Sequence, residues 1–152
     1  MSAAALWVLV ILLGLQLGAG MYETLVIVPL WSSNPPSSIA VFFGQPLRPD
    51  PGRRLWIYLS PLTAIVSIAN LGLAWFSAEP RRTWWLAGAA CAVIVLAATF
   101  AYFVPAILAL AKSANDPAAA AKARRWVALN WIRAALLVIA WLAVLKAFSL
   151  SA

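Results

Sequence analysis

The sequence predicts an all-α protein: one domain over residues 1–152, folded as an antiparallel bundle of four transmembrane helices with a long first loop. Hydrophobic residues make up 65% of the 152-residue chain and charged residues only 10%, whereas a soluble domain is roughly half apolar. The apolar residues gather in four long runs, and roughly 20 such residues are enough for a helix to cross a bilayer. Basic residues flank these runs, as is typical of membrane proteins.

The four spans begin and end at recognisable signals. They lie at about Ala4–Leu30, Arg54–Phe76, Thr83–Ala111 and Pro117–Phe148. The last three follow an acid–proline pair, namely Asp50-Pro51, Glu79-Pro80 and Asp116-Pro117. The acid can accept hydrogen bonds from free N–H groups at a helix start, and a proline at the first helical position loses no hydrogen bond. The fourth span exceeds 30 residues, or roughly 45 Å, so we expect its first two turns to project beyond the hydrocarbon.

The connections differ in length. The first loop, Trp31–Arg53, contains five prolines and a short apolar stretch, Ile39–Gly44. That stretch is too short to span a membrane, so we expect it either in the interface or folded over the mouth of the bundle. The second loop, Ser77–Arg82, is predicted to be a tight turn. No internal repeat stands out.

The distribution of lysine and arginine predicts the topology. Loops 1 and 3 carry Arg48, Arg53, Arg54, Lys112, Lys122, Arg124 and Arg125. The opposite side carries Arg81, Arg82 and Lys146. The positive-inside rule then places loops 1 and 3 in the cytoplasm and both termini outside, and we expect a bacterial inner membrane. The net charge of +7 therefore indicates topology, not nucleic-acid binding. Tryptophans near the span ends fit either interfacial belts or ordinary packing.

The chain lacks the usual ligands of a metal ion or a haem, and we expect neither a metal site nor a cofactor. The chain has no histidine, which is the commonest metal ligand, and its one cysteine, Cys91, lies in an apolar run. Nucleophilic catalysis lacks a Ser–His pair, and a thiolate is disfavoured in apolar surroundings. The functional groups that remain for catalysis or binding are a carboxylate, a guanidinium and several hydroxyl groups.

Two charged residues, Glu23 and Arg133, lie inside apolar runs, where an unpaired charge is costly and marks a candidate functional site. Each lies about 10 Å inside its span by helical rise, at the end near loops 1 and 3. Other polar or amphipathic side chains fall at similar depth, or on one helical stripe with Arg133, and are predicted to bind substrate. They are Tyr22, Ser60, Thr63, Thr99, Tyr102, Trp126 and Asn130.

Two interpretations of this convergence stay open. In one, Glu23 and Arg133 form an interhelical ion pair that fixes the bundle, with Asn130 and the hydroxyl groups as hydrogen-bonding partners. In the other, they line a pocket open to the cytoplasm or the inner leaflet. We favour the pocket, because a single ion pair would suffice to fix the register and more polar groups converge here. In such a pocket a buried carboxylate can act as a base, and an arginine can hold the resulting anion.

Three segments of the sequence resemble a known family. Gly18–Pro29 combines small residues, an aromatic residue and a closing proline; Tyr102–Pro105 is followed by Asn115; and Trp126–Arg133 carries a Trp/Asn/Arg pattern. These segments are similar to those of the anthrone oxygenase-like family of small four-helix membrane proteins. The resemblance implies a membrane-embedded oxygenase of aromatic polyketides that needs no metal or flavin, or a relative of unknown activity. The proline-rich first loop departs from the family pattern.

Two functional hypotheses follow. The first is a cofactor-independent oxygenase or proton-transfer enzyme acting on a lipophilic aromatic, anthrone-like or quinone-like substrate. Glu23 would be its base and Arg133 its anion holder, while Tyr22, Tyr102 and Asn130 would position the substrate. The alternative is a non-enzymatic protein that binds or transports a lipophile, or a structural subunit of a membrane complex. The expected partners are membrane lipids, a lipophilic small molecule and a second copy of the chain, which would pack on Ala87, Gly88, Ala90 and Ala97.

Overall fold

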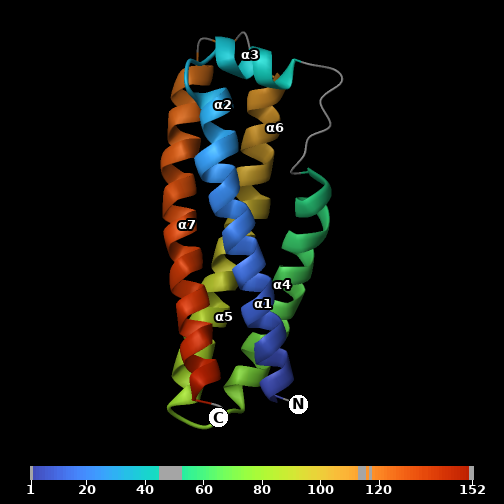
Figure 1. The fold of residues 1–152 in the computed structure, drawn as a ribbon, viewed down its shortest axis with the longest axis vertical. Helices are drawn as coiled ribbons and strands as arrows, with labels where there is room; N and C mark the ends of the chain where they lie inside the picture. The colour runs from blue at the N-terminus through green and yellow to red at the C-terminus, as the bar shows by residue number, and fades with distance from the viewer. Residues whose placement is uncertain (1, 45–52, 113–115, 117, 151–152) are drawn as a thin grey trace.

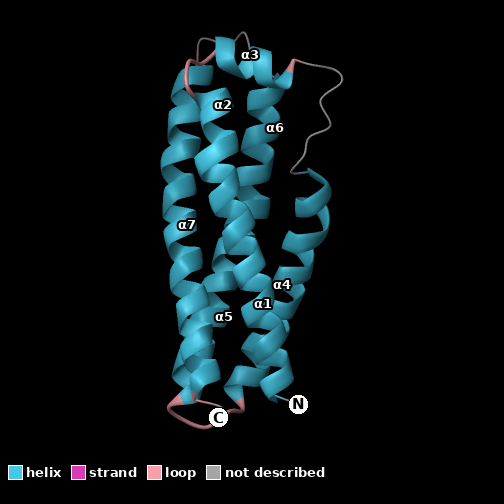
Figure 2. Ribbon diagram, in the orientation of Figure 1, coloured by secondary structure: helices cyan, strands magenta, loops and turns pink. Residues whose placement is uncertain are grey.

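The structure, a computed structural model, describes residues 2–44, 53–112, 116 and 118–150. Helices account for nearly all of this part of the chain, which contains no strand (Figures 1 and 2). The helical segments are α1 (Ser2–Tyr22), η1 (Glu23–Ile27), α2 (Val28–Ser32), α3 (Ser37–Phe43), α4 (Arg53–Trp75), α5 (Arg81–Ala98), η2 (Thr99–Phe103), α6 (Val104–Lys112) and α7 (Ala119–Ser149). The segments η1 and η2 are π-helical.

Four continuous helices are long and apolar enough to cross a membrane, as predicted. They run over Ala3–Ser32, Arg54–Trp75, Arg81–Lys112 and Ala119–Ser149. The first and the third each consist of two α-helical parts joined by a π-helical segment. α1 packs on α4 and α7, and α5 packs on the same two helices, so the spans form a ring in chain order. Both termini lie at one end of the bundle and α3 lies at the other (Figure 1), which confirms the antiparallel arrangement.

The half of the bundle nearer the termini has a core of aliphatic and small residues, here called the terminal core. Its members include Leu6, Leu9, Leu13, Trp85, Ala89, Ala140 and Val144. Gly88 lets α5 approach α7 closely, because a methyl group at this position would lie 2.5 Å from Cγ2 of Val144 and 2.9 Å from the carbonyl oxygen of Ala140. Gly88, expected on a face for self-association, thus packs inside the chain.

The half nearer α3 has an aromatic core, here called the loop core. It contains Val28, Trp31, Ile39, Phe103, Leu110, Ala119, Ala123 and Trp126. α4 begins only part-way along the bundle (Figure 1), so this half is built from α2, α6 and the start of α7. The short helix α3 packs on α2 and α6 and buries Ile39 completely. Of the two placements expected for Ile39–Gly44, the structure therefore shows the one over the mouth of the bundle.

The first and third spans share a local irregularity that the sequence analysis did not identify. The amide of Val28 donates to the carbonyl of Glu23, and the amide of Val104 donates to that of Thr99. Each π-helical segment ends two residues before a proline, Pro29 or Pro105. A proline inside a helix lacks an N–H donor and clashes with the carbonyl four residues earlier, and a single wide turn is one way to accommodate it.

The helix starts follow the predicted chemistry, with a shift of position. The Glu79 carboxylate accepts hydrogen bonds from the amide and the hydroxyl of Thr83, at 3.3 and 2.7 Å. The Asp116 carboxylate accepts from the Ala118 amide at 2.8 Å. Pro80 occupies the N-cap position of α5 instead of the first helical position. Asp50-Pro51 and Pro117 lie outside the described residues. The fourth span has 31 residues, as predicted, and the first and third have 30 and 32.

Candidate functional site

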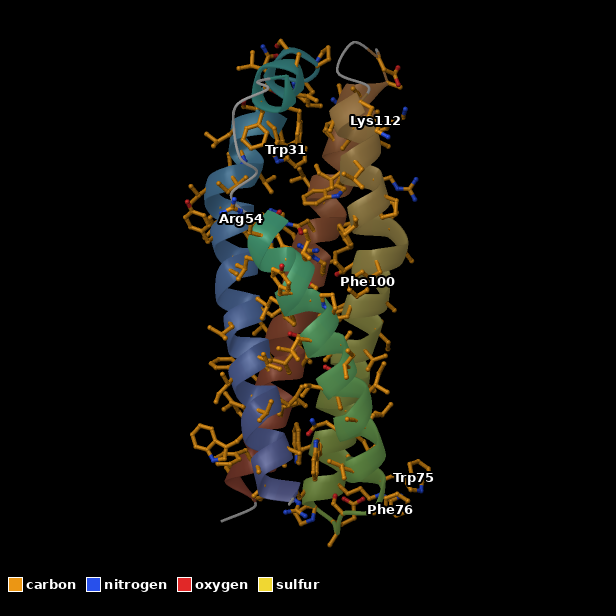
Figure 3. All side chains as sticks on the ribbon, turned by 90° about the vertical axis from the view of Figure 1, so that its right-hand side faces the viewer. Trp31, Arg54, Trp75, Phe76, Phe100 and Lys112 are labelled. Atoms are coloured by element: carbon orange, nitrogen blue, oxygen red, sulfur yellow. The ribbon has the colours of Figure 1, made fainter. Side chains whose placement is uncertain are left out.

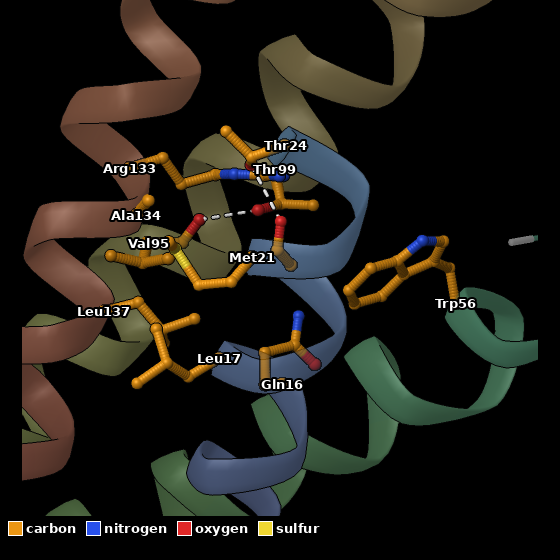
Figure 4. A pocket seen from close by; sticks show the side chains of 11 residues that line it. Gln16, Leu17, Met21, Thr24, Trp56, Val95, Thr99, Arg133, Ala134 and Leu137 are labelled. Carbon is orange, nitrogen blue, oxygen red and sulfur yellow. Dashed lines mark hydrogen bonds between the residues drawn. The ribbon is translucent and has the colours of Figure 1, made fainter. Parts of the chain in front are cut away.

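A small pocket lies between all four spans, at the level where α4 begins (Figure 4). It is lined by Gln16, Leu17, Gly20, Met21, Thr24, Trp56, Val95, Thr99, Arg133, Ala134 and Leu137. Its volume is about 20 Å³, which is enough for roughly one water-sized group. An aromatic ring therefore does not fit inside it in this conformation, although a single polar atom does.

The two charged residues predicted from the sequence meet beside this pocket. Nη2 of Arg133 lies 4.0 Å from Oε2 of Glu23, and their side chains are 16% and 29% exposed. The guanidinium also lies 4.6 Å from the ring centre of Phe103, within the range of a cation–π contact. Arg133 lines the pocket, whereas Glu23 stands beside Arg133 outside the lining residues. The arginine is therefore the charged group that a molecule in the pocket would meet.

Two buried amide side chains connect the helices around the pocket. Nδ2 of Asn130 donates to the Thr24 hydroxyl at 2.8 Å, and that hydroxyl donates its own proton to the carbonyl of Gly20 at 2.7 Å. Nε2 of Gln16 donates to the Ser60 hydroxyl at 3.1 Å. Oδ1 of Asn130 and Oε1 of Gln16 are buried and have no hydrogen-bond partner within the described part of the chain. Buried acceptors of this kind normally have a partner in a native protein.

The hydroxyl-bearing residues on the middle spans are mostly bonded to their own helices. Thr63 donates to the carbonyl of Leu59 at 2.7 Å, and Thr99 donates to that of Val95 at 2.8 Å. Thr99 lines the pocket, while Thr63 lies outside it on α4. Ser60 is buried and serves as the acceptor for Gln16. These hydroxyl groups shape and support the pocket, because their protons are already used or their oxygens already occupied.

The aromatic residues predicted to bind substrate lie away from the pocket. Tyr22 is 60% exposed on the outside of the bundle. Trp126 belongs to the loop core, where its Nε1 donates to the carbonyl of Phe103 at 3.2 Å. Tyr102 packs edge-on against Phe103, with the guanidinium of Arg125 5.9 Å from its ring centre. Tyr22 and Tyr102 were predicted from their depth, which does not tell which way a side chain turns about the helix axis. Trp126 was predicted because it lies on one helical stripe with Asn130 and Arg133, and at the start of that stripe the neighbouring groups are those of the loop core.

The structure adds residues that the prediction left out of the site. Gln16, Met21 and Thr24 line the pocket from the first span, and Trp56 lines it from α4. Gln16 lies on the same helical stripe as Glu23, and a buried amide in an apolar run was the signal that could have identified it. Trp56 is one of the tryptophans near the span ends that were expected either in an interfacial belt or in ordinary packing. Within the described ranges, no three His, Cys, Asp or Glu side chains come together as a possible metal site.

Comparisons of this chain with protein-family models, curated proteins and solved structures give no match. The anthrone oxygenase-like resemblance therefore stays a prediction from the three sequence segments. The functional argument depends on the geometry of the pocket.

Proposed function

We propose that this chain is an integral membrane protein that binds the polar head of a lipophilic molecule beside Arg133, without catalysing a reaction on it. The observation that carries the proposal is the make-up of the pocket: a buried cation and a buried amide among apolar walls, in a space for one polar group. The apolar walls include Leu17, Met21 and Leu137. An amphiphile could place its head there and leave its body between the helices and the lipid.

The exposed aromatic residues support this placement of the site at a membrane interface. Tyr58 and Trp75, both exposed on α4, are about 26 Å apart by helical rise. Trp84 and Phe100, exposed on the third span, are about 24 Å apart. Figure 3 shows Trp75 at the end near the termini and Phe100 part-way up the bundle. Two such aromatic levels are expected at the two faces of a hydrocarbon layer of about 30 Å.

The pocket lies at the aromatic level farther from the termini, because Trp56 is half a turn from Tyr58 and Thr99 directly precedes Phe100. This is the depth at which the head of a membrane amphiphile lies. We further propose that loops 1 and 3 face the cytoplasm of a bacterial cell and that both termini lie outside. Exposed basic residues near that end, including Arg54, Lys112 and Arg124, support this orientation through the positive-inside rule.

Photo-crosslinking tests the binding proposal. The protein, reconstituted in lipid nanodiscs, is irradiated with a long-chain alcohol that carries a diazirine near its hydroxyl, and labelled residues are mapped by mass spectrometry. We expect labelling of Gln16, Met21 or Trp56, and its loss in Arg133→Met. The matched control is Arg125→Met, which removes another arginine of α7 outside the pocket and should keep the labelling. Labelling confined to the exposed Tyr22 and Tyr58 would contradict the proposal.

A second candidate is the cofactor-independent oxygenase, favoured by the carboxylate and guanidinium 4.0 Å apart. Glu23 would remove a proton from an anthrone-like substrate, Arg133 would hold the enolate, and dioxygen would oxidise it to the quinone with release of water. The pocket would have to widen to admit the ring. The test is quinone formation by the purified protein and by Glu23→Gln. Equal rates in both would remove Glu23 from the reaction, and no turnover in either would leave the binding function alone.

A further inference from the structure

We infer that the head group held in this pocket is a carboxylate at the end of an apolar chain, as in a fatty acid. The inference deepens the proposed function and rests on it. It begins with the unused hydrogen-bonding capacity of Arg133. A guanidinium carries several N–H donors, but within the described part of the chain that of Arg133 donates no hydrogen bond. Even its contact with Glu23, at 4.0 Å, exceeds the roughly 3.2 Å limit of an N–H···O hydrogen bond.

The guanidinium of Arg133 is mostly buried, yet a group in the pocket can reach it. Its side chain is 16% exposed and forms part of the pocket wall. Unlike the amide oxygens of Gln16 and Asn130, its nitrogens are not among the described side-chain atoms that are sealed from contact and have no partner. A buried cation is costly unless hydrogen-bonding partners surround it. A ligand that places acceptors in the pocket therefore supplies what this guanidinium needs.

The charges around the pocket favour an anionic acceptor. Among the described residues that line the pocket, Arg133 is the one that carries a charge, because Glu23 stands outside the lining. A guanidinium and a carboxylate form paired charge-assisted hydrogen bonds, which are stronger than bonds to a neutral oxygen. An ammonium head would be repelled by the same guanidinium. Arg54, which is exposed at the start of α4 (Figure 3), adds a second positive charge at the level of the pocket.

The size of the pocket favours a carboxylate over a phosphate. A volume of about 20 Å³ accommodates roughly one oxygen atom, so one carboxylate oxygen can enter while the rest of the head stays at the mouth. A phosphate is tetrahedral and bulkier. Figure 4 shows Trp56 across the pocket from Arg133, and both Trp56 and Met21 are partly exposed. The chain of the ligand would therefore leave the pocket past these two residues toward the lipid.

Competition against the photoreactive alcohol, measured as loss of pocket labelling in nanodiscs, tests the inference. The measurement is made at about pH 9, where a carboxylic acid is ionised even in a partly desolvated site. The matched competitors are hexadecanoate and hexadecanamide, which share the chain and the planar head and differ in charge. We expect hexadecanoate to compete about tenfold more strongly, because its bonds to the guanidinium join two opposite charges. Hexadecyl phosphate, whose head is larger, should compete less strongly than hexadecanoate.

Glu23 gives a test of charge within the protein itself. Its carboxylate lies close enough to Arg133 to repel an anionic head, so Glu23→Gln should raise the preference for hexadecanoate over hexadecanamide by a further factor of about three. The matched control is Asp116→Asn, which removes an acid near the start of α7, outside the pocket, and should leave the preference unchanged. Glu23→Met serves as a second variant if Glu23→Gln fails to fold, and it should give the same increase.

The outcomes separate this inference from the proposed function. Equal competition by hexadecanoate and hexadecanamide, with pocket labelling intact, would overturn the carboxylate inference and leave the binding function standing. Strongest competition by hexadecyl phosphate would overturn it in favour of a phosphate head. An unchanged or smaller preference in the Glu23 variants would also overturn it, because the bound head would then not carry a charge close to Glu23. Absence of pocket labelling in the wild-type protein would overturn both proposals.

Discussion

The helices pack differently in the two halves of this bundle. Around the terminal core, all four spans run side by side as regular α-helices, and Gly88 brings α5 against α7. α4 does not extend to the loop core (Figure 1). There, two spans contain a π-helical turn, and the rings of Trp31, Phe103 and Trp126 fill the space between the helices. The polar pocket lies between the halves. This difference indicates that close helix packing in the half near the termini allows the other half to contain irregular turns and polar groups.

Of the changes considered, substitution of Gly88 should lower the stability of the terminal core most. In Gly88→Val the added atoms would overlap Val144 and the carbonyl of Ala140, so we expect the free energy of unfolding to fall by about 3 kcal/mol. Unfolding in mixed detergent micelles measures it. The matched control is Gly72→Ala, where a methyl group would meet nothing within 4 Å and stability should stay equal or rise. An equal loss in both variants would show that packing at Gly88 is not special.

The ion pair at the junction of the halves should give the next largest effect. Arg133→Met leaves the Glu23 carboxylate without its guanidinium while both positions are more than two-thirds buried, and we expect a loss of about 2 kcal/mol. The double variant Glu23→Gln/Arg133→Met carries no unbalanced charge. It should recover at least half of that loss in the same micelle titration. Additive losses would mean that the two charges do not stabilise each other.

The hydrogen bond between the first and fourth spans should contribute less. Thr24→Val and Asn130→Leu each remove one partner of the 2.8 Å bond, and a double-mutant cycle isolates their interaction. We expect a coupling of about 1 kcal/mol, the magnitude of interhelical hydrogen bonds in membrane proteins. Ser67→Ala, whose hydroxyl bonds within α4, should show no coupling to Asn130→Leu. Zero coupling for Thr24 and Asn130 would remove this bond from the forces that hold the site.

The smallest effect concerns the exposed start of the fourth span. The hydrogen bond from Lys122, followed by that from the Ala118 amide, lowers the pKa of Asp116. Because the folded pKa is the lower one, this contribution is present above about pH 4, the ordinary carboxylate range, and is lost as the pH falls through the folded value. Lys122→Gln should raise the pKa of Asp116, and Lys112→Gln should not. Carboxyl NMR titration checks both, and an unchanged value in Lys122→Gln would contradict the assignment.

Much of the fold could be predicted because each span is fixed by the summed cost of placing its residues in lipid. The predicted spans agree with the observed helices to within a few residues, and the capping roles of Glu79 and Asp116 are confirmed. α4 begins at Arg53, one residue before the predicted start of the second span, and ends at Trp75, one residue before its predicted end. The two π-helical turns could not be predicted from Pro29 and Pro105 alone, since a proline can also end a helix or bend it.

The site was predicted only in part. Glu23 and Arg133 do lie close together, because a charge within an apolar run is costly unless an opposite charge pairs with it. Tyr22 is next to Glu23 in the sequence but is turned outward, since one residue along a helix rotates the side chain by about 100°. The sequence by itself thus determined which segments are long and apolar enough to cross a membrane and at which level along its helix each polar group lies. Only the tertiary structure decided which groups of equal depth face one another, because the rotation of each helix is set by packing against its neighbours.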